Sequence, residues 1–304
     1  MAVARLGRTR VVSPLRPVDL SLTLGPLCRG RSDPTMRIGA DGVWRATRTP
    51  EGPATLHLRS DGSRITAEAW GPGASWMLEA APGLVGAGDD EDGFEPRHAV
   101  LAQLHRRLRG LRIGRSNAVA EALVPTVLEQ KVQGIQARRS YHRLVRILGE
   151  RAPGPAPLLL PPAPARLADL PYHDFHRINV ERRRAQTVRL VARHARRLDE
   201  TTSMTPEAAT VRLRALPGVG AWTAAEVALL ALGDADAVST GDYHLPHHVA
   251  WALAGEARAD DTRMLELLEP YKGHRGRVIR LVVAGHPGPP RFGPRLPLKT
   301  ISSY

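Results

Sequence analysis

The sequence has almost no cysteine and no long apolar segment, and each of these absences excludes a class of protein. Cys28 is the one cysteine in 304 residues, which excludes a disulfide framework, a four-cysteine iron–sulfur cluster and a cysteine-rich zinc site. No apolar run approaches the roughly 20 residues of a membrane span, and the basic N-terminus lacks the apolar core of a secretory signal. We therefore expect a soluble, cytoplasmic protein that is not embedded in a membrane.

Lysine is also scarce, although the chain is strongly basic. Lys131, Lys272 and Lys299 are the only lysines, so arginine supplies most of the 43 basic residues and of the net charge of +13. The planar fork of arginine binds phosphate oxygens, which makes nucleic acid the first candidate partner and an acidic membrane surface the second. A GC-rich genome produces the same arginine excess, and composition alone does not separate the two explanations.

Two segments concentrate the positive charge. Residues 176–198 contain eight arginines and one acid, Glu181, and residues 276–304 contain five basic residues and no acid. One interpretation is a solvated helix face followed by a loose tail. The other is contact with the phosphates of a nucleic acid.

The residue pattern changes near residue 95. Before it, the alternating runs 54–59 and 64–70 are joined by the turn Ser60-Asp61-Gly62-Ser63 and predict a β-hairpin. The acidic residues 89–93 are typical of a linker or turn. After it, apolar residues recur at helical spacing. We therefore expect two domains, a small β-rich one over 1–95 and a helical one over 96–304. Beyond a first helical segment after His98, the expected helices cover 179–198, 205–215, 221–232, 243–253 and 260–269, with a proline-rich connection over 152–165 and an irregular tail from 287.

A glycine turn between two expected helices is the most informative motif. Thr205 can cap a helix that has Pro206 at its first position, and that helix ends at Leu216-Pro217-Gly218-Val219-Gly220, because proline disfavours helical backbone in the residue before it. The glycines allow a tight turn. A second helix starts at once with Ala221, and the unpaired N–H groups of its first turn can bind a DNA phosphate without reading a base. A Gly-Val-Gly turn can also simply join two packed helices.

This segment resembles the helix-hairpin-helix of the DNA glycosylase superfamily, and the likeness is closest to bacterial 3-methyladenine DNA glycosylase II, the AlkA type. The resemblance covers residues 96–285 well and 1–95 more loosely. In that superfamily a Gly/Pro-rich stretch and an aspartate follow the hairpin. Gly241 and Asp242 are present here, but proline is absent between the hairpin and Asp242. The resemblance implies a mainly α fold, a glycosylase core with the hairpin at about 205–232 and a smaller N-terminal α+β domain that is rich in strands.

By this resemblance Asp242 matches the catalytic aspartate, while Asp234 and Asp236 fall in the preceding loop. Breaking a base–sugar bond builds positive charge on the sugar, which a carboxylate stabilises while it orients the attacking water. The other interpretation of Asp242 is a cap of the next helix, worth about 1 kcal/mol.

The resemblance also implies a pocket for an extruded base. Trp222 matches a pocket tryptophan, although it can instead pack the hairpin, and Tyr243 is a weaker pocket candidate. Glu226 stands where an aromatic residue is expected, which leaves the substrate range open. Gly218, Val219, Gly220, Ala221 and Thr223 of the hairpin are the residues expected to bind DNA.

Upstream, the run Val127-Leu128-Glu129-Gln130-Lys131-Val132-Gln133 resembles a segment that inserts a wedge into the DNA in this superfamily. Gln130 and Lys131 are then DNA-binding, with Lys131 at the wedge position, where leucine or glutamine is more usual. The alternative is one ordinary amphipathic helix over 118–148.

His244, His247 and His248 suggest a metal site with Asp242, but a metal site needs a fuller ligand set. The resemblance implies neither a catalytic metal nor a cofactor. It implies a monovalent cation held by main-chain carbonyls of the hairpin, here those of Arg214, Leu216 and Val219.

Together these features predict an enzyme, an N-glycosidic hydrolase similar to DNA-3-methyladenine glycosylase II. We expect it to excise alkylated purines from damaged double-stranded DNA as a cytoplasmic, nucleoid-associated monomer. It would flip the base out of the duplex, hydrolyse its bond to the sugar and leave the strand intact. Two alternatives remain, a non-catalytic helix-hairpin-helix DNA-binding protein and, on the histidines, a metal-dependent nuclease.

Overall fold

Five strands in the first 70 residues form one antiparallel sheet. The computed structural model describes residues 7–290. Its strands are β1 (Arg8–Val12), β2 (Met36–Gly39), β3 (Gly42–Thr49), β4 (Gly52–Ser60) and β5 (Ile65–Trp70), in the order β1-β5-β4-β3-β2. The expected hairpin is confirmed, because Ser60 pairs with Ile65. In its turn, Asp61 Oδ1 accepts hydrogen bonds from the backbone N–H groups of Ser63 and Arg64.

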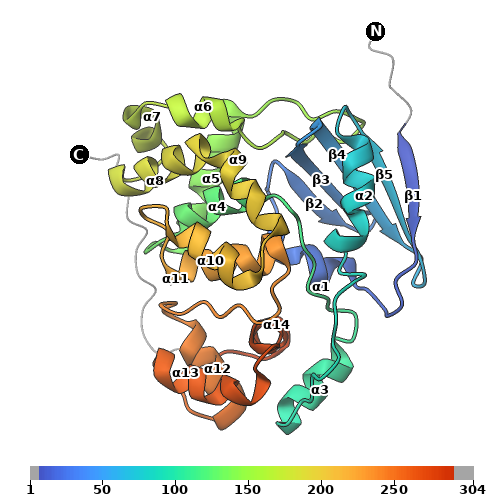
Figure 1. The fold of residues 1–304 in the computed structure, drawn as a ribbon, viewed down its shortest axis with the longest axis vertical. Helices are drawn as coiled ribbons and strands as arrows, with labels where there is room; N and C mark the ends of the chain where they lie inside the picture. Colours follow the sequence, from blue (N-terminus) through green and yellow to red (C-terminus); the bar gives the residue numbers. More distant parts are fainter. Residues whose placement is uncertain (1–6, 291–304) are drawn as a thin grey trace.

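The two faces of the sheet are covered by different parts of the chain. Helix α2 (Ala74–Leu84) packs on the face that carries Val43 and Leu56 (Figure 1). The proline-rich residues 152–160 pack on the other face, where Leu158 and its neighbours bury Ala46. This segment therefore covers hydrophobic surface as well as connecting two helices.

The rest of the chain is helical, as the apolar spacing predicts. The helices are α1 (Leu20–Leu24), α3 (Ala99–Arg107), α4 (Val119–Glu129), α5 (Gly134–Leu148), α6 (Pro164–Asp169), α7 (Tyr172–Arg177), α8 (Arg182–Arg193), α9 (Ala195–Asp199), α10 (Pro206–Arg214), α11 (Ala221–Val227), α12 (Leu245–Ala254), α13 (Asp261–Leu268) and α14 (Arg275–Gly285), with short 3₁₀ turns η1 (Gly25–Leu27), η2 (Glu200–Ser203) and η4 (Glu269–Tyr271) and a π-helical turn η3 (Ala228–Leu232).

The alternative of one amphipathic helix over 118–148 is wrong, because the chain forms α4 and α5 with a turn between them. Lys131 has a φ of +55°, a left-handed conformation that a continuous helix cannot contain. The helix expected over 179–198 is likewise divided, into α8 and α9 at His194. Apolar spacing continued through both breaks, so it did not reveal them.

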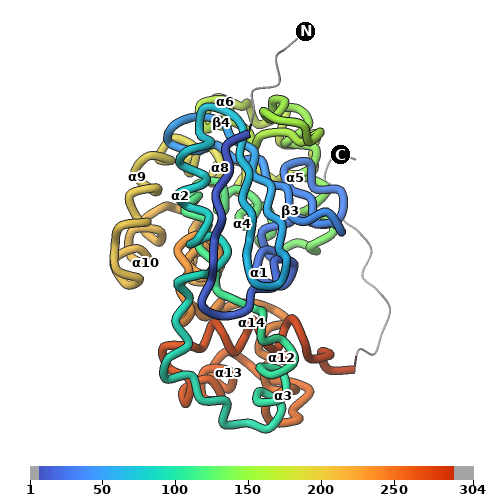
Figure 2. Tube along the Cα trace, turned by 90° about the vertical axis from the view of Figure 1, so that its right-hand side faces the viewer, coloured from blue at the N-terminus to red at the C-terminus, as the bar shows by residue number. Residues whose placement is uncertain are grey.

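The helical part of the chain has two hydrophobic clusters. One includes Val127, Leu144 and Phe175 and lies among the helices from α4 to α11. The other includes Leu101 and Met264 and joins α3 to α12, α13 and α14 at the lower end of the molecule in Figures 1 and 2. The segment between α11 and α12 passes from the first group to the second, so residues on it lie at their junction. The division at residue 95 stays a proposal.

Part of the arginine excess stabilises the fold. Arg184 is buried and its Nη1 donates to the carbonyl of Leu128 at 2.7 Å, while burial lowers its pKa. Arg277 is 1% exposed and pairs with Asp89 at 2.7 Å, inside the acidic segment expected to be a linker. These two arginines cannot contact DNA, which corrects the phosphate-contact interpretation at both positions. Arg291, Arg295 and Lys299 of the basic tail, with most of its expected irregular course, lie outside the described residues.

Candidate active site

The glycine turn joins α10 to α11 as a tight hairpin. Thr205 Oγ1 accepts a hydrogen bond from the N–H of Ala208, so the expected cap is confirmed. Gly218 has a φ of +89°, and a Cβ there would lie 2.1 Å from Thr187 Oγ1. Both facts require glycine at this position. Gly220 is the N-terminal cap residue of α11.

In the hairpin, main-chain groups are more available to a ligand than side chains. Val219 is 5% exposed and Thr223 is 2% exposed. The Nε2 of Gln130 donates to Thr223 Oγ1 and to the carbonyl of Gly218, both at 2.8 Å. Any phosphate contact here therefore falls to main-chain N–H groups near Gly220 and to the exposed Ala221. Gln130 itself binds the hairpin.

The turn after α4 presents Lys131 beside the hairpin. Gln130 fastens this turn to the hairpin through the two bonds just described, and Lys131 follows it as an exposed residue with left-handed backbone. An exposed side chain at a fixed turn suits insertion into a duplex, so the wedge role of Lys131 stays a prediction.

Asp242 is fixed by three N–H donors from two helices. Its Oδ1 accepts from the backbone N–H groups of His244 at 2.7 Å and Leu245 at 2.8 Å, and its Oδ2 accepts from Nε1 of Trp222 at 3.1 Å. The two interpretations of Asp242 are thus compatible, because one oxygen caps the start of α12 while the other faces the hairpin helix. The carboxylate is half-buried, so it remains open to solvent.

The other pocket candidates differ in their surroundings. Trp222 is half-buried and holds Asp242. Tyr243 is 80% exposed, and its ring meets the rings of His244 and His247 with centroids 4.9 and 6.1 Å apart. Tyr243 therefore lies on open surface, and the structure does not bring it into a closed pocket with Trp222.

Glu226 lies among charged groups from several elements. Ser239 Oγ donates to its Oε1. Burial raises the pKa of the Glu226 carboxyl, and the nearby carboxylates of Glu129 and Asp242 add to the rise, while Ser239 and Arg29 oppose it. Glu226 thus shares one electrostatic environment with Asp242.

Two arginines of this environment were missed by sequence reasoning. Arg29 pairs with Glu129 at 3.2 Å, across 100 residues of sequence, and no local pattern indicates such a contact. Arg280 of α14 donates from Nη2 to the carbonyl of Leu22 in α1 at 2.8 Å, and Figures 1 and 2 both place α1 beside α14. Burial lowers the pKa of Arg280 to about 10, which the charge of Glu226 opposes. In the sequence, Arg280 falls in the basic stretch 276–304, for which phosphate contact was one of two interpretations.

The histidines near Asp242 have protein partners. His247 Nδ1 accepts from the N–H of Ala259 at 3.1 Å, and His248 Nε2 donates to the carbonyl of His286 at 2.8 Å. Within residues 7–290 no group of three or more His, Cys, Asp or Glu side chains could hold a metal ion. The arrangement of His244, His247 and His248 therefore gives no support to a metal-dependent nuclease.

The hairpin carbonyls fit the expected monovalent cation in part. Among the described backbone N–H groups outside helices, none donates to the carbonyls of Arg214 or Val219, whereas that of Leu216 accepts from Val219 at 3.0 Å. Each carbonyl oxygen therefore keeps at least one lone pair for an ion.

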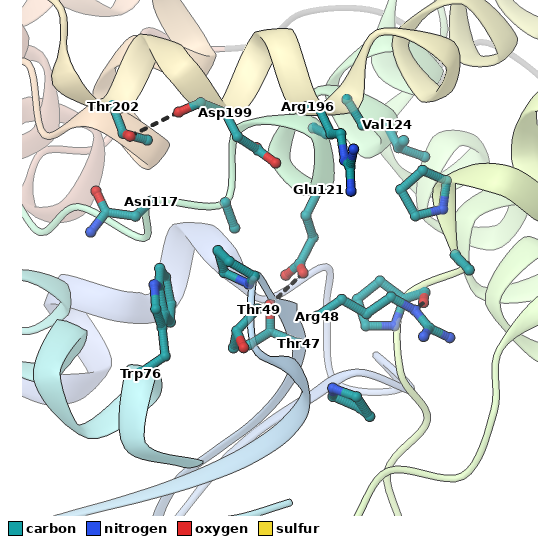
Figure 3. A pocket seen from close by; sticks show the side chains of 18 of the residues that line it. Thr47, Arg48, Thr49, Trp76, Asn117, Glu121, Val124, Arg196, Asp199 and Thr202 are labelled. Carbon is teal, nitrogen blue, oxygen red and sulfur yellow. Dashed lines mark hydrogen bonds between the residues drawn. The ribbon is translucent and has the colours of Figure 1, made fainter. Parts of the chain in front are cut away.

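A cavity of about 960 Å³ lies elsewhere, between the sheet and the helical core. Thr47, Trp76, Glu121, Arg196 and Asp199 surround it (Figure 3). Trp222, Glu226 and Asp242 do not line it. The hydrogen-bonded carboxylate of Asp242 lies instead at the hairpin.

Comparisons with solved structures identify the fold. A 3-methyladenine DNA glycosylase from Archaeoglobus fulgidus matches with a TM-score of 0.75 and 18% identity, over 90% of this chain and 97% of that one. An 8-oxoguanine glycosylase/lyase from Clostridium acetobutylicum, in complex with DNA, matches with a TM-score of 0.67 and 12% identity, over 90% and 96%. A 3-methyladenine DNA glycosylase from Schizosaccharomyces pombe, in complex with abasic DNA, matches with a TM-score of 0.51 and 16% identity, over 67% and 95%.

No protein-family model and no curated protein matches the sequence. At these identities the likeness shows the fold, which is that of the helix-hairpin-helix DNA glycosylases, and the predicted resemblance is confirmed at that level. In the part of the chain that the structure describes, no helix is long and apolar enough to cross a membrane.

Proposed function

We propose that this protein, which has the fold of the helix-hairpin-helix DNA glycosylases, removes alkylated purines from double-stranded DNA. The observation that carries the proposal is the carboxylate of Asp242, held at the start of α12 by two backbone N–H groups and turned towards the hairpin helix by Trp222. A carboxylate fixed beside a phosphate-binding element repels DNA. A glycosylase needs such a carboxylate for catalysis, whereas a module that only binds DNA does not.

In the proposed reaction Asp242 stabilises the positive charge that develops on the sugar as the base leaves, and it orients the attacking water. A base alkylated on a ring nitrogen is already cationic and departs without a strong general acid. Since Asp242 is held by N–H donors from two elements, it needs little reorganisation during the reaction.

The target base has to leave the duplex, at a cost of a few kcal/mol that is smallest for damaged bases. The hairpin N–H groups near Gly220 bind a phosphate and fix the register, with a monovalent cation at the carbonyls of Arg214, Leu216 and Val219 neutralising the turn. Lys131, anchored beside the hairpin through Gln130, enters the space that the base vacates. The protein acts on DNA as a monomer.

The product is an abasic site in an intact strand. Strand cleavage by related enzymes uses a lysine in the second hairpin helix, and its amine attacks the sugar. The matching residue here is Trp222, which carries no amine and is engaged with Asp242. Lys131 belongs to the wedge and would lie in the duplex, away from the sugar.

The test is an excision assay on duplexes that each contain one damaged base. Base release that needs no added metal and leaves an alkali-labile site supports the proposal. Tight binding without release from any damaged duplex would favour the alternative, a non-catalytic helix-hairpin-helix DNA-binding protein.

A further inference from the structure

The cavity between the sheet and the helical core has no part in the proposed excision, because Trp222 and Asp242 do not line it. Its volume of about 960 Å³ lies within the range of about 300–1,000 Å³ that is usual for pockets that bind small molecules. Its walls come from β3, α2, α4, α9 and the proline-rich connection. A hollow that several elements build together can hold a ligand in a defined position.

The walls of the cavity offer flat, rigid surfaces. Trp76 of α2 lines it beside the strand β3 (Figure 3), and this residue is half-buried, so part of its ring is free to contact a ligand. Proline rings from the β3–β4 turn and from the connection supply further apolar wall, namely Pro50, Pro53, Pro161, Pro162 and Pro164. Walls of this kind suit a planar ligand that stacks on the indole.

Most charged groups that line the cavity are already bound to the protein. The two carboxylate oxygens of Glu121 accept from Arg45 Nη2 and from Thr47 Oγ1. Arg48 Nε donates to a backbone carbonyl of the proline-rich connection at 2.8 Å. Arg115 Nη2 donates to a backbone carbonyl of η2 at 2.7 Å. These groups shape the cavity and have little capacity left for a ligand.

Two side chains of α9 differ from this pattern. Asp199 and Arg196 are three residues apart, so they share one face of the helix, and both project from α9 opposite Thr47 and Trp76 (Figure 3). Among residues 7–290 neither of the two forms an ion pair. Partial burial raises the pKa of Asp199 to about 6, and the charge of Glu121 adds to the rise. The cavity therefore presents a carboxylate and a guanidinium that both lack a charged partner.

We propose that this cavity binds a free purine base, which stacks on Trp76, donates N–H groups to Asp199 and accepts from Arg196. The site is distinct from the proposed catalytic centre, and the inference does not depend on the glycosylase function.

The chemistry of a purine fits these groups. Guanine carries the acceptor O6 next to two N–H donors, N1 and the 2-amino group, on one edge of a flat ring. A carboxylate accepts the two donors in parallel, and a guanidinium donates to the oxygen. A phosphate is a poorer ligand, because Arg48 and Arg115 are occupied by carbonyls while the charge of Asp199 is not neutralised. A base without phosphate is therefore the ligand that these residues favour.

The experiment measures binding of two methylated purines to the full-length protein by calorimetry. One probe is 7-methylguanine, which has the N–H donors, and the other is caffeine, a flat purine with the same C6 carbonyl and N7 methyl group but without any N–H donor. The variants are Asp199→Asn and Arg196→Gln. The matched control is Arg197→Gln, because Arg197 is an exposed neighbour that does not line the cavity. Asp242→Asn tests whether the base binds at the catalytic site instead.

We expect 7-methylguanine to bind, and caffeine to bind at least roughly 10-fold more weakly. Asp199→Asn and Arg196→Gln each raise the Kd of 7-methylguanine by roughly 10- to 100-fold, as expected for a lost hydrogen bond to a charged group, whereas Arg197→Gln and Asp242→Asn leave it unchanged. No binding of 7-methylguanine, equal binding of caffeine, or a loss in Asp242→Asn that Asp199→Asn does not share would each overturn the inference. Excision from damaged duplexes is assayed separately, so these outcomes leave the glycosylase proposal standing.

Discussion

Replacement of Asp242 by asparagine tests the proposed catalytic group with a small change in shape. In Asp242→Asn the side-chain carbonyl can still accept from the N–H groups of His244 and Leu245, as Oδ1 does in the wild type. The amide NH₂ then faces the N–H of Trp222, where Oδ2 accepted a bond at 3.1 Å. The variant loses the negative charge and one hydrogen bond.

The cost to folding is modest and the cost to catalysis is large. A hydrogen bond to a charged group contributes about 1.5–3 kcal/mol, less than the roughly 5–15 kcal/mol by which domains are stable, so the variant folds. A carboxylate about 4 Å from a full charge on the sugar contributes about 4 kcal/mol at an effective dielectric constant of about 20. Its loss lowers the excision rate by roughly a thousandfold.

The assay is single-turnover excision from a methylated duplex, with affinity for the same duplex measured separately. Affinity stays the same or improves, because a negative charge near phosphate is removed. The matched control is Asp260→Asn, which alters the carboxylate that caps α13 through the N–H of Arg263 and leaves excision intact. Near-normal excision by Asp242→Asn would refute the catalytic assignment.

The basic surface, the residue at position 222 and the carboxylate of Asp199 each give a further test. The Kd for undamaged duplex rises steeply between about 50 and 200 mM salt, by counterion release; a Kd independent of salt would rule out binding through the arginines. Borohydride reduction during turnover yields no protein–DNA adduct, because Trp222 replaces the nucleophilic lysine; an adduct that Lys131→Ala abolishes would make Lys131 the nucleophile. Partial burial raises the pKa of Asp199 to about 6, so Asp199 favours the folded state below its ordinary pKa and this contribution is lost as pH rises through about 6. Asp199→Asn therefore raises the Tm relative to the wild type at pH 8 and less at pH 5; thermal melts showing the same difference at both values would contradict this.

The sequence indicated those features whose causes are local. The β-hairpin follows from alternation around Gly62, and the cap and turn of the hairpin follow from Thr205 and Gly218, whose physical requirements do not depend on distant residues. Asp242 could be singled out because a helix begins immediately after it. The breaks at Lys131 and His194 could not be predicted, since apolar spacing continues through both of them.

The environment of Glu226 depends on contacts between distant segments. The charges of Arg29 and Arg280, which act on Glu226, come from opposite ends of the chain, and neither residue belongs to a motif. Composition also overstated the DNA-binding surface, because a buried arginine such as Arg184 or Arg277 looks the same in sequence as an exposed one. Exposure and partners, which decide the role of each arginine, follow only from packing.

We propose that the protein cuts the bond between an alkylated base and its sugar. The most direct measurement compares abasic sites in a methylated duplex with those in an unmethylated duplex of the same sequence, before and after alkali. We expect intact strands before alkali, and alkali-labile sites that form only in the methylated duplex and increase with time. Binding of the methylated duplex without formation of abasic sites would contradict it.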